Sequence, residues 1–360
     1  MSVRLLLPIL VVGAALAFAG LLLPPAASAF YLNLANVALA RAAALPPDAP
    51  DRSAALAEAD ARLIQARRYS DPDRLALAQA RTLLARGDAR RAADVLDQAR
   101  APGSDPVTEY LWANAEWQAG RRTAALEHWR RAGAMTFFMQ EAHRALDAHQ
   151  WKKASELSFI ATLIDPNLAD AHYVLAEGYS HDQPITSQVS DELDRARELT
   201  RDPELLAAIL SRKAEVLAGE GKLNQALGVF AEARALAPAD ARPRTGYALA
   251  LLALQPSERE QASALLVQVV EDSPWYTAAY VALADMAESD GDLKSAEAWL
   301  TKGLARNPND ARLLLPLGRL YSRHGRSEEA RAELVRALEF ESHADGLREI
   351  ALELSQLRAP

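Results

Sequence analysis

The sequence predicts an all-α fold, a right-handed α-solenoid of about eight to nine helix-turn-helix pairs, on the strength of three observations. Small residues recur at spacings of 29 to 37 positions, about 34 on average, glycines precede most of them by five positions, and no stretch alternates with the two-residue period of a β-strand. The recurring residues are Ala92, Ala125, Ala154, Val189, Ala226, Ala262, Ala296 and Ala330. A chain built from one repeating unit offers an extended surface rather than a single deep cleft.

Each repeating unit contains two helices. Further small residues lie twelve positions before and seven positions after most of the recurring ones, for example Ala214 and Ala233 around Ala226. Two helices that cross closely exclude bulky side chains at the contact, so small residues on both predict a tightly packed pair. Glycines are expected in the turn between the two helices, where a left-handed conformation is needed: Gly87, Gly120, Gly221, Gly291 and Gly325. Prolines are expected to end the second helix: Pro166, Pro238, Pro274 and Pro308.

These positions resemble the tetratricopeptide repeat, which has small residues at its eighth, twentieth and twenty-seventh positions and proline at its thirty-second. The best copies are 210–238, 280–308 and 314–337, and the resemblance covers about 73–340. It implies a membrane-anchored bacterial protein of this family, whose solenoid binds a protein or peptide in a concave groove. A pentatricopeptide array, which would bind single-stranded RNA, has a similar period but fits the small-residue pattern and the charge less well.

The first 40 residues differ in composition from the rest. No charged residue occurs from Leu5 to Ala40, and the apolar run 5–23 would be about 28 Å long as a helix, close to the thickness of a bilayer core. Residues 1–29 are therefore predicted to be an uncleaved transmembrane anchor or a signal peptide cleaved near Ala27-Ser28-Ala29. A third interpretation is a buried core helix.

The charges around this segment predict its orientation. Arg4 precedes it, whereas the next basic residue, Arg41, lies far beyond it, so the amino terminus is expected on the cytoplasmic side. The repeats would then be extracytoplasmic, on a single-pass protein of the bacterial cytoplasmic membrane. If the segment is a cleaved signal, the protein is secreted or periplasmic instead.

The remaining boundaries follow the pattern. Residues 30–72 are predicted to be a degenerate first helix pair, which caps the array or rests in the membrane interface. The solenoid proper covers 73–343, and 344–360 form a capping helix that keeps the last repeat soluble.

Composition excludes several kinds of partner and chemistry. The net charge is −8, and acidic residues outnumber basic ones throughout the predicted exposed part, which disfavours nucleic acid. Without cysteine the chain has no disulfide, thiolate metal site or lipid-carrying cysteine. No phosphate loop, nucleophile elbow or spaced set of metal ligands is present. We therefore expect no enzyme activity, no cofactor and no metal.

Carried over by position, the groove-facing residues of the resemblance fall in an aromatic-rich part of the chain. The candidate partner-binding residues are Tyr110, Asn114, Trp117, Met139, His143, Tyr173 and Glu177. Large aromatic side chains in a groove suit an inserted peptide side chain or a sugar ring. The sequence thus predicts a non-enzymatic scaffold that binds a protein or peptide; the alternative is a component that guides a cell-envelope polysaccharide along the groove.

Overall fold

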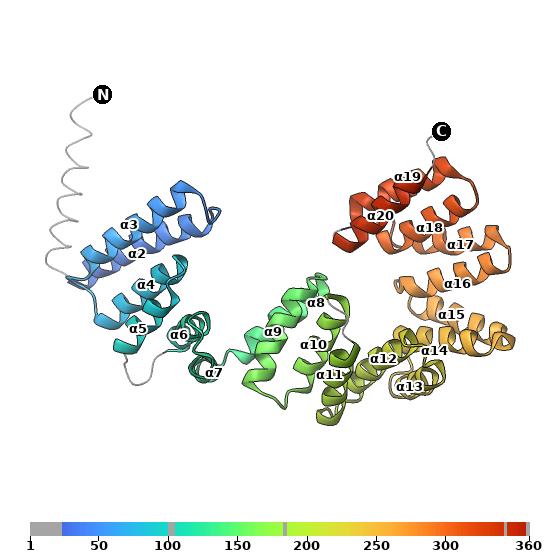
Figure 1. Ribbon diagram of the computed structural model, residues 1–360, viewed down its shortest axis with the longest axis horizontal. Coiled ribbons are helices and arrows are strands. Elements are labelled where there is room, and N and C mark those ends of the chain that lie inside the picture. The colour runs from blue at the N-terminus through green and yellow to red at the C-terminus, as the bar shows by residue number, and fades with distance from the viewer. Residues whose placement is uncertain (1–23, 100–104, 183–185, 342–343, 358–360) are drawn as a thin grey trace. The chain divides into compact units, whose positions relative to one another are not determined.

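The computed structural model describes residues 24–99, 105–182, 186–341 and 344–357, and there it is entirely helical (Figure 1). The α-helices are α2 (Pro24–Ala43), α3 (Pro50–Ala66), α4 (Pro72–Ala85), α5 (Ala89–Gln98), α6 (Pro106–Gln118), α7 (Arg122–Arg131), α8 (Met135–Asp147), α9 (Trp151–Ile164), α10 (Ala169–Asp182), α11 (Thr186–Leu199), α12 (Pro203–Gly219), α13 (Leu223–Leu236), α14 (Ala241–Leu254), α15 (Arg259–Asp272), α16 (Thr277–Ser289), α17 (Leu293–Leu304), α18 (Ala311–Arg323), α19 (Ser327–Phe340) and α20 (Ala344–Gln356). A short 3-10 helix, Pro256–Glu258, precedes α15. The predicted fold class is confirmed for these residues.

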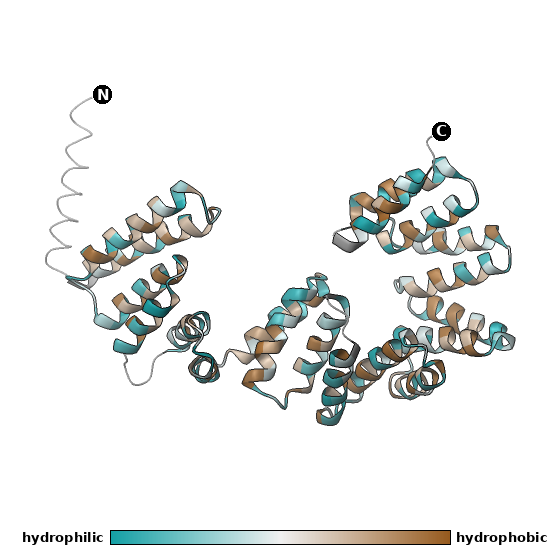
Figure 2. Cartoon of the chain, viewed as in Figure 1, coloured by the Kyte–Doolittle hydropathy of each residue, from teal (hydrophilic) through white to brown (hydrophobic). Residues whose placement is uncertain are grey.

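The helices pack in sequence order, each against the next. The chain divides into two compact units, 1–138 and 139–360, with the boundary inside α8. In the first unit α2 packs on α3, α4 on α5 and α6 on α7; the second unit continues the same way from α9 to α20. Hydrophobic and hydrophilic residues share these helices (Figure 2), as expected when only one side of each faces a neighbour.

The first helices of successive pairs also touch one another. In the second unit α10 contacts α12, α12 contacts α14, α14 contacts α16 and α16 contacts α18. We call the surface that these five helices form the first-helix face. Side chains from repeats that are far apart in the sequence can therefore meet on it.

The recurring small residues lie where the helices cross. All eight of them are buried, at 2% exposure for Val189 and 0% for the seven alanines. At Gly318, which takes the small position of α18, an added Cβ would lie 2.7 Å from Leu334 Cγ, so the approach of α18 to α19 depends on the missing side chain. The interpretation of the 34-residue period as a packing period is confirmed.

The turns within the pairs use the predicted glycines. Gly87, Gly120, Gly221, Gly291 and Gly325 all have φ between 73° and 83°, a region that other residues adopt only with strain. In the pair α8/α9 the same position is His149, with φ 53°. The predicted prolines follow the ends of α9, α13, α15 and α17, also as expected.

Aspartate side chains begin many of the helices. Their carboxylates accept hydrogen bonds from backbone N–H groups of the first turn, which have no partner within the helix. These aspartates are Asp71, Asp88, Asp105, Asp202, Asp240, Asp292 and Asp310. Each places the first residues of a helix firmly, and those residues include Arg242 of the site described below.

The predicted membrane run 5–23 lies outside the described residues. Among the helices that the structure does describe, none has the length and apolar character that a bilayer span needs. Helix α2 begins at Pro24, so the possible cleavage sequence at 27–29 lies within it. Ala27 and Ser28 are buried there, and the Ser28 hydroxyl lies 2.7 Å from that of Ser70.

Candidate functional site

Three of the predicted groove residues lie on α6 in the first unit, and all three are half-buried. Tyr110 packs edge-on against Phe137, with ring centroids 5.4 Å apart. Asn114 Oδ1 accepts a hydrogen bond of 3.3 Å from Trp129 Nε1, and the Trp117 ring lies 5.2 Å from that of Trp129. Asn114 and Trp117 thus both contact the buried Trp129, while part of each remains open to solvent.

Two further candidates lie on α8 and differ in exposure. Met139 is buried, so its side chain contributes to packing and does not reach a ligand. His143 is exposed, and its Nε2 lies 2.8 Å from Asp170 Oδ2 of α10. The hydrogen bond from Asp170 raises the pKa of His143, with partial burial acting in the opposite direction.

The last two candidates, Tyr173 and Glu177, meet on α10 in a buried ionic network. Glu177 is 6% exposed and forms ion pairs with Arg212 of α12 and with Arg242 of α14, whose Nη1 lies 3.0 Å from Glu177 Oε1. Burial would by itself raise the pKa of Glu177, but the two guanidinium groups lower it to about 2. Glu177 is therefore ionised at every pH at which the protein is used.

Glu215 of α12 completes the network. Arg242 Nε and Nη2 donate to its two carboxylate oxygens at 2.7 and 2.8 Å, a paired geometry that fixes the guanidinium plane. Arg242 Nη1 also donates to the Tyr173 hydroxyl at 3.3 Å, and Arg212 Nη1 lies 2.9 Å from Glu215 Oε2. Two arginines and two glutamates from three first helices thus balance in charge. We call these four residues, with Tyr173, the Glu177 network.

A histidine and a tryptophan adjoin this network. His181, one turn beyond Glu177 on α10, stacks on Trp151 of α9 with ring centroids 4.1 Å apart, and its Nε2 lies 3.3 Å from Arg212 Nη2. Burial and the nearby Arg212 lower the pKa of His181. The imidazole is thus neutral at pH 7 and stays stacked as an uncharged ring.

A pocket of about 340 Å3 opens beside Arg242. Its lining combines the polar groups of Glu215, Arg242, Thr245 and Tyr276 with apolar side chains from α12, α13, α14 and α16, among them Phe230 and Leu249. Burial raises the pKa of Tyr276 to about 12, so its hydroxyl stays protonated. We call this the Arg242 pocket. Its volume falls at the lower end of the range for sites that hold a small ligand or one side chain.

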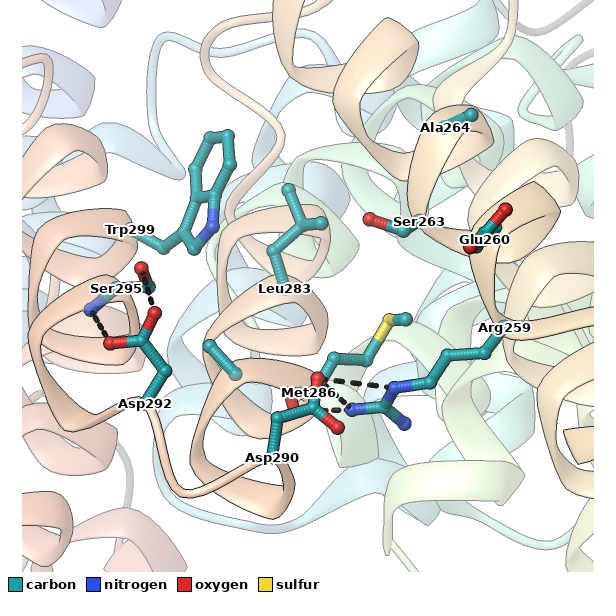
Figure 3. Close-up of a pocket in the computed structure, with 11 residues that line it drawn as sticks. Arg259, Glu260, Ser263, Ala264, Leu283, Met286, Asp290, Asp292, Ser295 and Trp299 are labelled. Atoms are coloured by element: carbon teal, nitrogen blue, oxygen red, sulfur yellow. Dashed lines mark hydrogen bonds and ion pairs between the residues drawn. The ribbon is translucent and has the colours of Figure 1, made fainter.

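A second and larger pocket, of about 560 Å3, lies between α15, α16 and α17 (Figure 3). One side is closed by Arg259, which pairs with Asp290 at 2.8 Å, and the other by Trp299, over which Lys302 lies at 4.8 Å. Asp292 in its rim is engaged as the cap of α17 through Ser295. The polar groups named here therefore already have partners within the chain.

No cluster of three or more potential metal ligands occurs among the described residues. The histidines His143, His172 and His181 each meet a different partner: Asp170, Glu192 and Arg212. These side chains thus stabilise packing between neighbouring helices and do not converge on a common point.

Sequence reasoning placed Tyr173 and Glu177 on the correct face but missed their partners. Arg212 lies 35 positions from Glu177 and Arg242 lies 65 positions from it, each on another first helix. The signal available in the sequence was the register: Glu177 and Glu215 both directly follow the small residue of their helices, Ala176 and Ala214. A search for arginines at neighbouring positions of the following repeats would have found the network.

Comparison with known proteins agrees with this helical arrangement. The family model for the tetratricopeptide repeat matches residues 253–313 and 287–345. A curated relative, cellulose synthase operon protein C of Xanthomonas axonopodis pv. citri (strain 306), is 32% identical over 349 residues, which is 88% of this chain. The chain spans only 20% of the length of that relative.

Solved structures with the same fold include the human IFIT1 dimer with PPP-AAAA. It has a TM-score of 0.52 at 14% identity, over 85% of this chain and 76% of that one. The type IV pilus biogenesis factor PilW reaches a TM-score of 0.45 at 18% identity, over 61% of this chain and 98% of its own. Residues 253–345 of this protein are therefore tetratricopeptide repeats, in a chain that is helical wherever the structure describes it.

Proposed function

We propose that this protein is a non-enzymatic scaffold that binds a protein or peptide partner on its first-helix face and holds that partner at a membrane. The Glu177 network carries the proposal, because four charged side chains from three repeats are already fixed in position before any partner arrives. A partner that contacts such a surface loses little free energy in ordering it. The neighbouring Arg242 pocket provides space into which the partner can insert.

The membrane tether in this proposal is the apolar run 5–23, with the amino terminus in the cytoplasm and the repeats outside it. The burial of Ala27 and Ser28 in α2 supports an uncleaved segment, because cleavage after Ala29 would remove both from their packing sites. Fractionation of cells, with the amino terminus of the mature protein determined by sequencing, tests this. Recovery from membranes with Met1 or Ser2 as first residue is the expected result, and a soluble protein that begins at Phe30 contradicts it.

Site-specific photocrosslinking in native membranes tests partner binding. One photoreactive residue replaces Asp285, an exposed residue of α16 that directly follows Ala284 and so shares the register of Glu177 and Glu215. A second replaces Trp117 on α6. The control position is Ala298, an exposed residue of the second helix α17. A discrete protein adduct from the first-helix positions and none from Ala298 is expected; equal labelling at all three contradicts a binding face.

The name of the curated relative favours one second candidate, a component that guides a cell-envelope polysaccharide. Support comes from the 32% identity to cellulose synthase operon protein C, and from the half-buried Tyr110 and Trp117, whose rings could stack on sugars. Replacing Trp117 by Ala separates the two functions. Loss of binding to a cell-envelope glucan with the protein adduct unchanged supports the second candidate, whereas the reverse supports the first.

The proposal does not include nucleic acid. The RNA in the IFIT1 structures belongs to proteins that share 14 to 16% of their residues with this chain, which establishes the fold alone. A net charge of −8 also opposes binding to a phosphate backbone. Filter binding with a triphosphorylated oligonucleotide at low salt should therefore give no retention.

A further inference from the structure

The Arg242 pocket contains a buried hydroxyl group that has no hydrogen-bond partner. Thr245 of α14 is 3% exposed, lines the pocket, and its Oγ1 is bonded to nothing in the structure. Serine and threonine within helices normally bond back to a preceding carbonyl, as Thr82 does to Ala78 O at 3.0 Å and Ser211 does to Ala207 O at 2.7 Å. A buried hydroxyl without a partner costs free energy, so a partner from outside the chain would be favoured.

The rest of the pocket is mainly apolar. Its floor is the ring of Phe230, and Leu249, which is 44% exposed, stands at its edge. The ring can reach under α14 only because residue 246 is glycine, since a Cβ there would lie 2.2 Å from Phe230 Cε1. The pocket thus has the depth and the surface to hold a flat apolar group.

The charged groups in the wall are already paired with each other. Arg242 and Glu215 share two hydrogen bonds, and Arg242 also bonds to Glu177. A ligand charge would have to break these contacts, which are made in a largely buried setting where separation of the ions is costly. The pocket therefore selects against a charged occupant.

From these contacts we infer that the Arg242 pocket takes one aromatic side chain of a peptide partner, with a polar tip that bonds to Thr245: a tyrosine or a tryptophan. The ring replaces water over Phe230 and Leu249, and the tyrosine hydroxyl or the indole N–H pairs with Thr245 Oγ1. A sugar ring presents several hydroxyl groups to its site, whereas the wall offers one unbonded hydroxyl beside a ring and aliphatic groups. This inference rests on the proposed function and specifies the partner at one position.

The test uses the full chain with labelled leucine methyl groups and three probes: N-acetyl-tyrosinamide, N-acetyl-phenylalaninamide and cellobiose. N-acetyl-tyrosinamide should shift the Leu249 methyl resonances and leave those of Leu236, which lies on α13 outside the pocket lining, in place. N-acetyl-phenylalaninamide should bind about 3- to 10-fold more weakly, because it cannot pair with Thr245. Cellobiose should not shift Leu249.

The variant Thr245→Val removes the hydroxyl and keeps the side-chain volume. In it the two amino-acid amides should bind equally, and the melting temperature should stay the same or rise, since no native hydrogen bond is lost. Thr82→Val is the matched control: it loses the bond to Ala78 and should melt lower. Equal binding of the two amides to the unaltered chain, no shift at Leu249, or a shift with cellobiose alone overturns the inference. If crosslinking at Asp285 still yields a protein adduct, the inference fails while the proposed function stands.

Discussion

Arg242 reaches past an entire repeat to bond with Glu177. The two residues are 65 positions apart, on α14 and α10, yet Arg242 Nη1 lies 3.0 Å from Glu177 Oε1. In most solenoids stability is the sum of contacts between nearest neighbours. Here one guanidinium links three consecutive pairs, because it bonds to Glu215 of the intervening α12 as well.

Removing the charge of Glu177 should therefore destabilise several repeats at once. In Glu177→Gln, Arg242 and Arg212 keep their positive charges in a largely buried place but lose a counter-ion, which costs about 3 kcal/mol by analogy with other broken buried ion pairs. Denaturant unfolding of the variant and the wild type measures this loss. Glu58→Gln, which breaks a pair with Arg41 on the surface, should leave the midpoint unchanged. A similar small effect at both sites would show that the network contributes nothing to stability.

The same carboxylate predicts a loss of stability in acid. The pKa of Glu177 is about 2 in the folded protein and 4.5 is its ordinary value, so its contribution is fully present above pH 4.5 and is lost as the pH falls toward 2. A difference of this size corresponds to about 3 kcal/mol. Other carboxylates titrate in the same range, so the test compares the pH dependence of unfolding in wild type and Glu177→Gln. The gap between the two should close between pH 4.5 and pH 2; a constant gap contradicts the assigned pKa.

Two histidines should titrate on opposite sides of 6.5. The hydrogen bond from Asp170 raises the pKa of His143, whereas burial and Arg212 lower the pKa of His181. Imidazole resonances followed by NMR from pH 5 to 9 should show His181 losing its proton first as the pH rises. In Asp170→Asn the midpoint of His143 should fall and that of His181 should not move. The opposite order of titration would mean that these side chains have other partners in solution.

Two glycines in one helix pair should respond in opposite ways to alanine. Gly221 has φ +75° in the turn between α12 and α13, so Gly221→Ala should cost about 1 kcal/mol through backbone strain alone, since nothing lies near the added Cβ. Gly228 lies inside α13 with ordinary φ and equally free surroundings, and Gly228→Ala should gain about 0.5–1 kcal/mol. Thermal unfolding of both variants measures the difference, and a shift of the same sign in both would refute the assignment of the turn.

The helix pairs and their turns could be predicted because each depends on contacts within about 34 residues. Ala226 had to be small where α12 and α13 cross, and Gly221 had to adopt positive φ between them, so both left a mark at a fixed position. The first pair followed a weaker pattern. The sequence indicated a boundary at residue 30, whereas α2 starts at Pro24, because the residues around Ala27 pack on the second pair and that contact has no periodic signature.

The candidate site could be predicted only in part. Register placed Tyr173 and Glu177 on the first-helix face, where the structure has them. Met139 obeyed the same register but is buried, since its exposure depends on how α8 packs. Arg242 could not be assigned because a bond across two repeats depends on how the pairs stack, and no local pattern encodes that.

His149 gives the array a weak point. It alone among the six pair turns named here adopts the left-handed conformation with a full side chain, at a cost of about 1–2 kcal/mol. In a linear array, cooperative unfolding breaks where the coupling between neighbours is least favourable. The amides of α8 and α9 should thus exchange with solvent before those of α16 and α17, whose turn has Gly291. A pull on the chain would open the protein first at this joint, and the Glu177 network beyond it would remain folded.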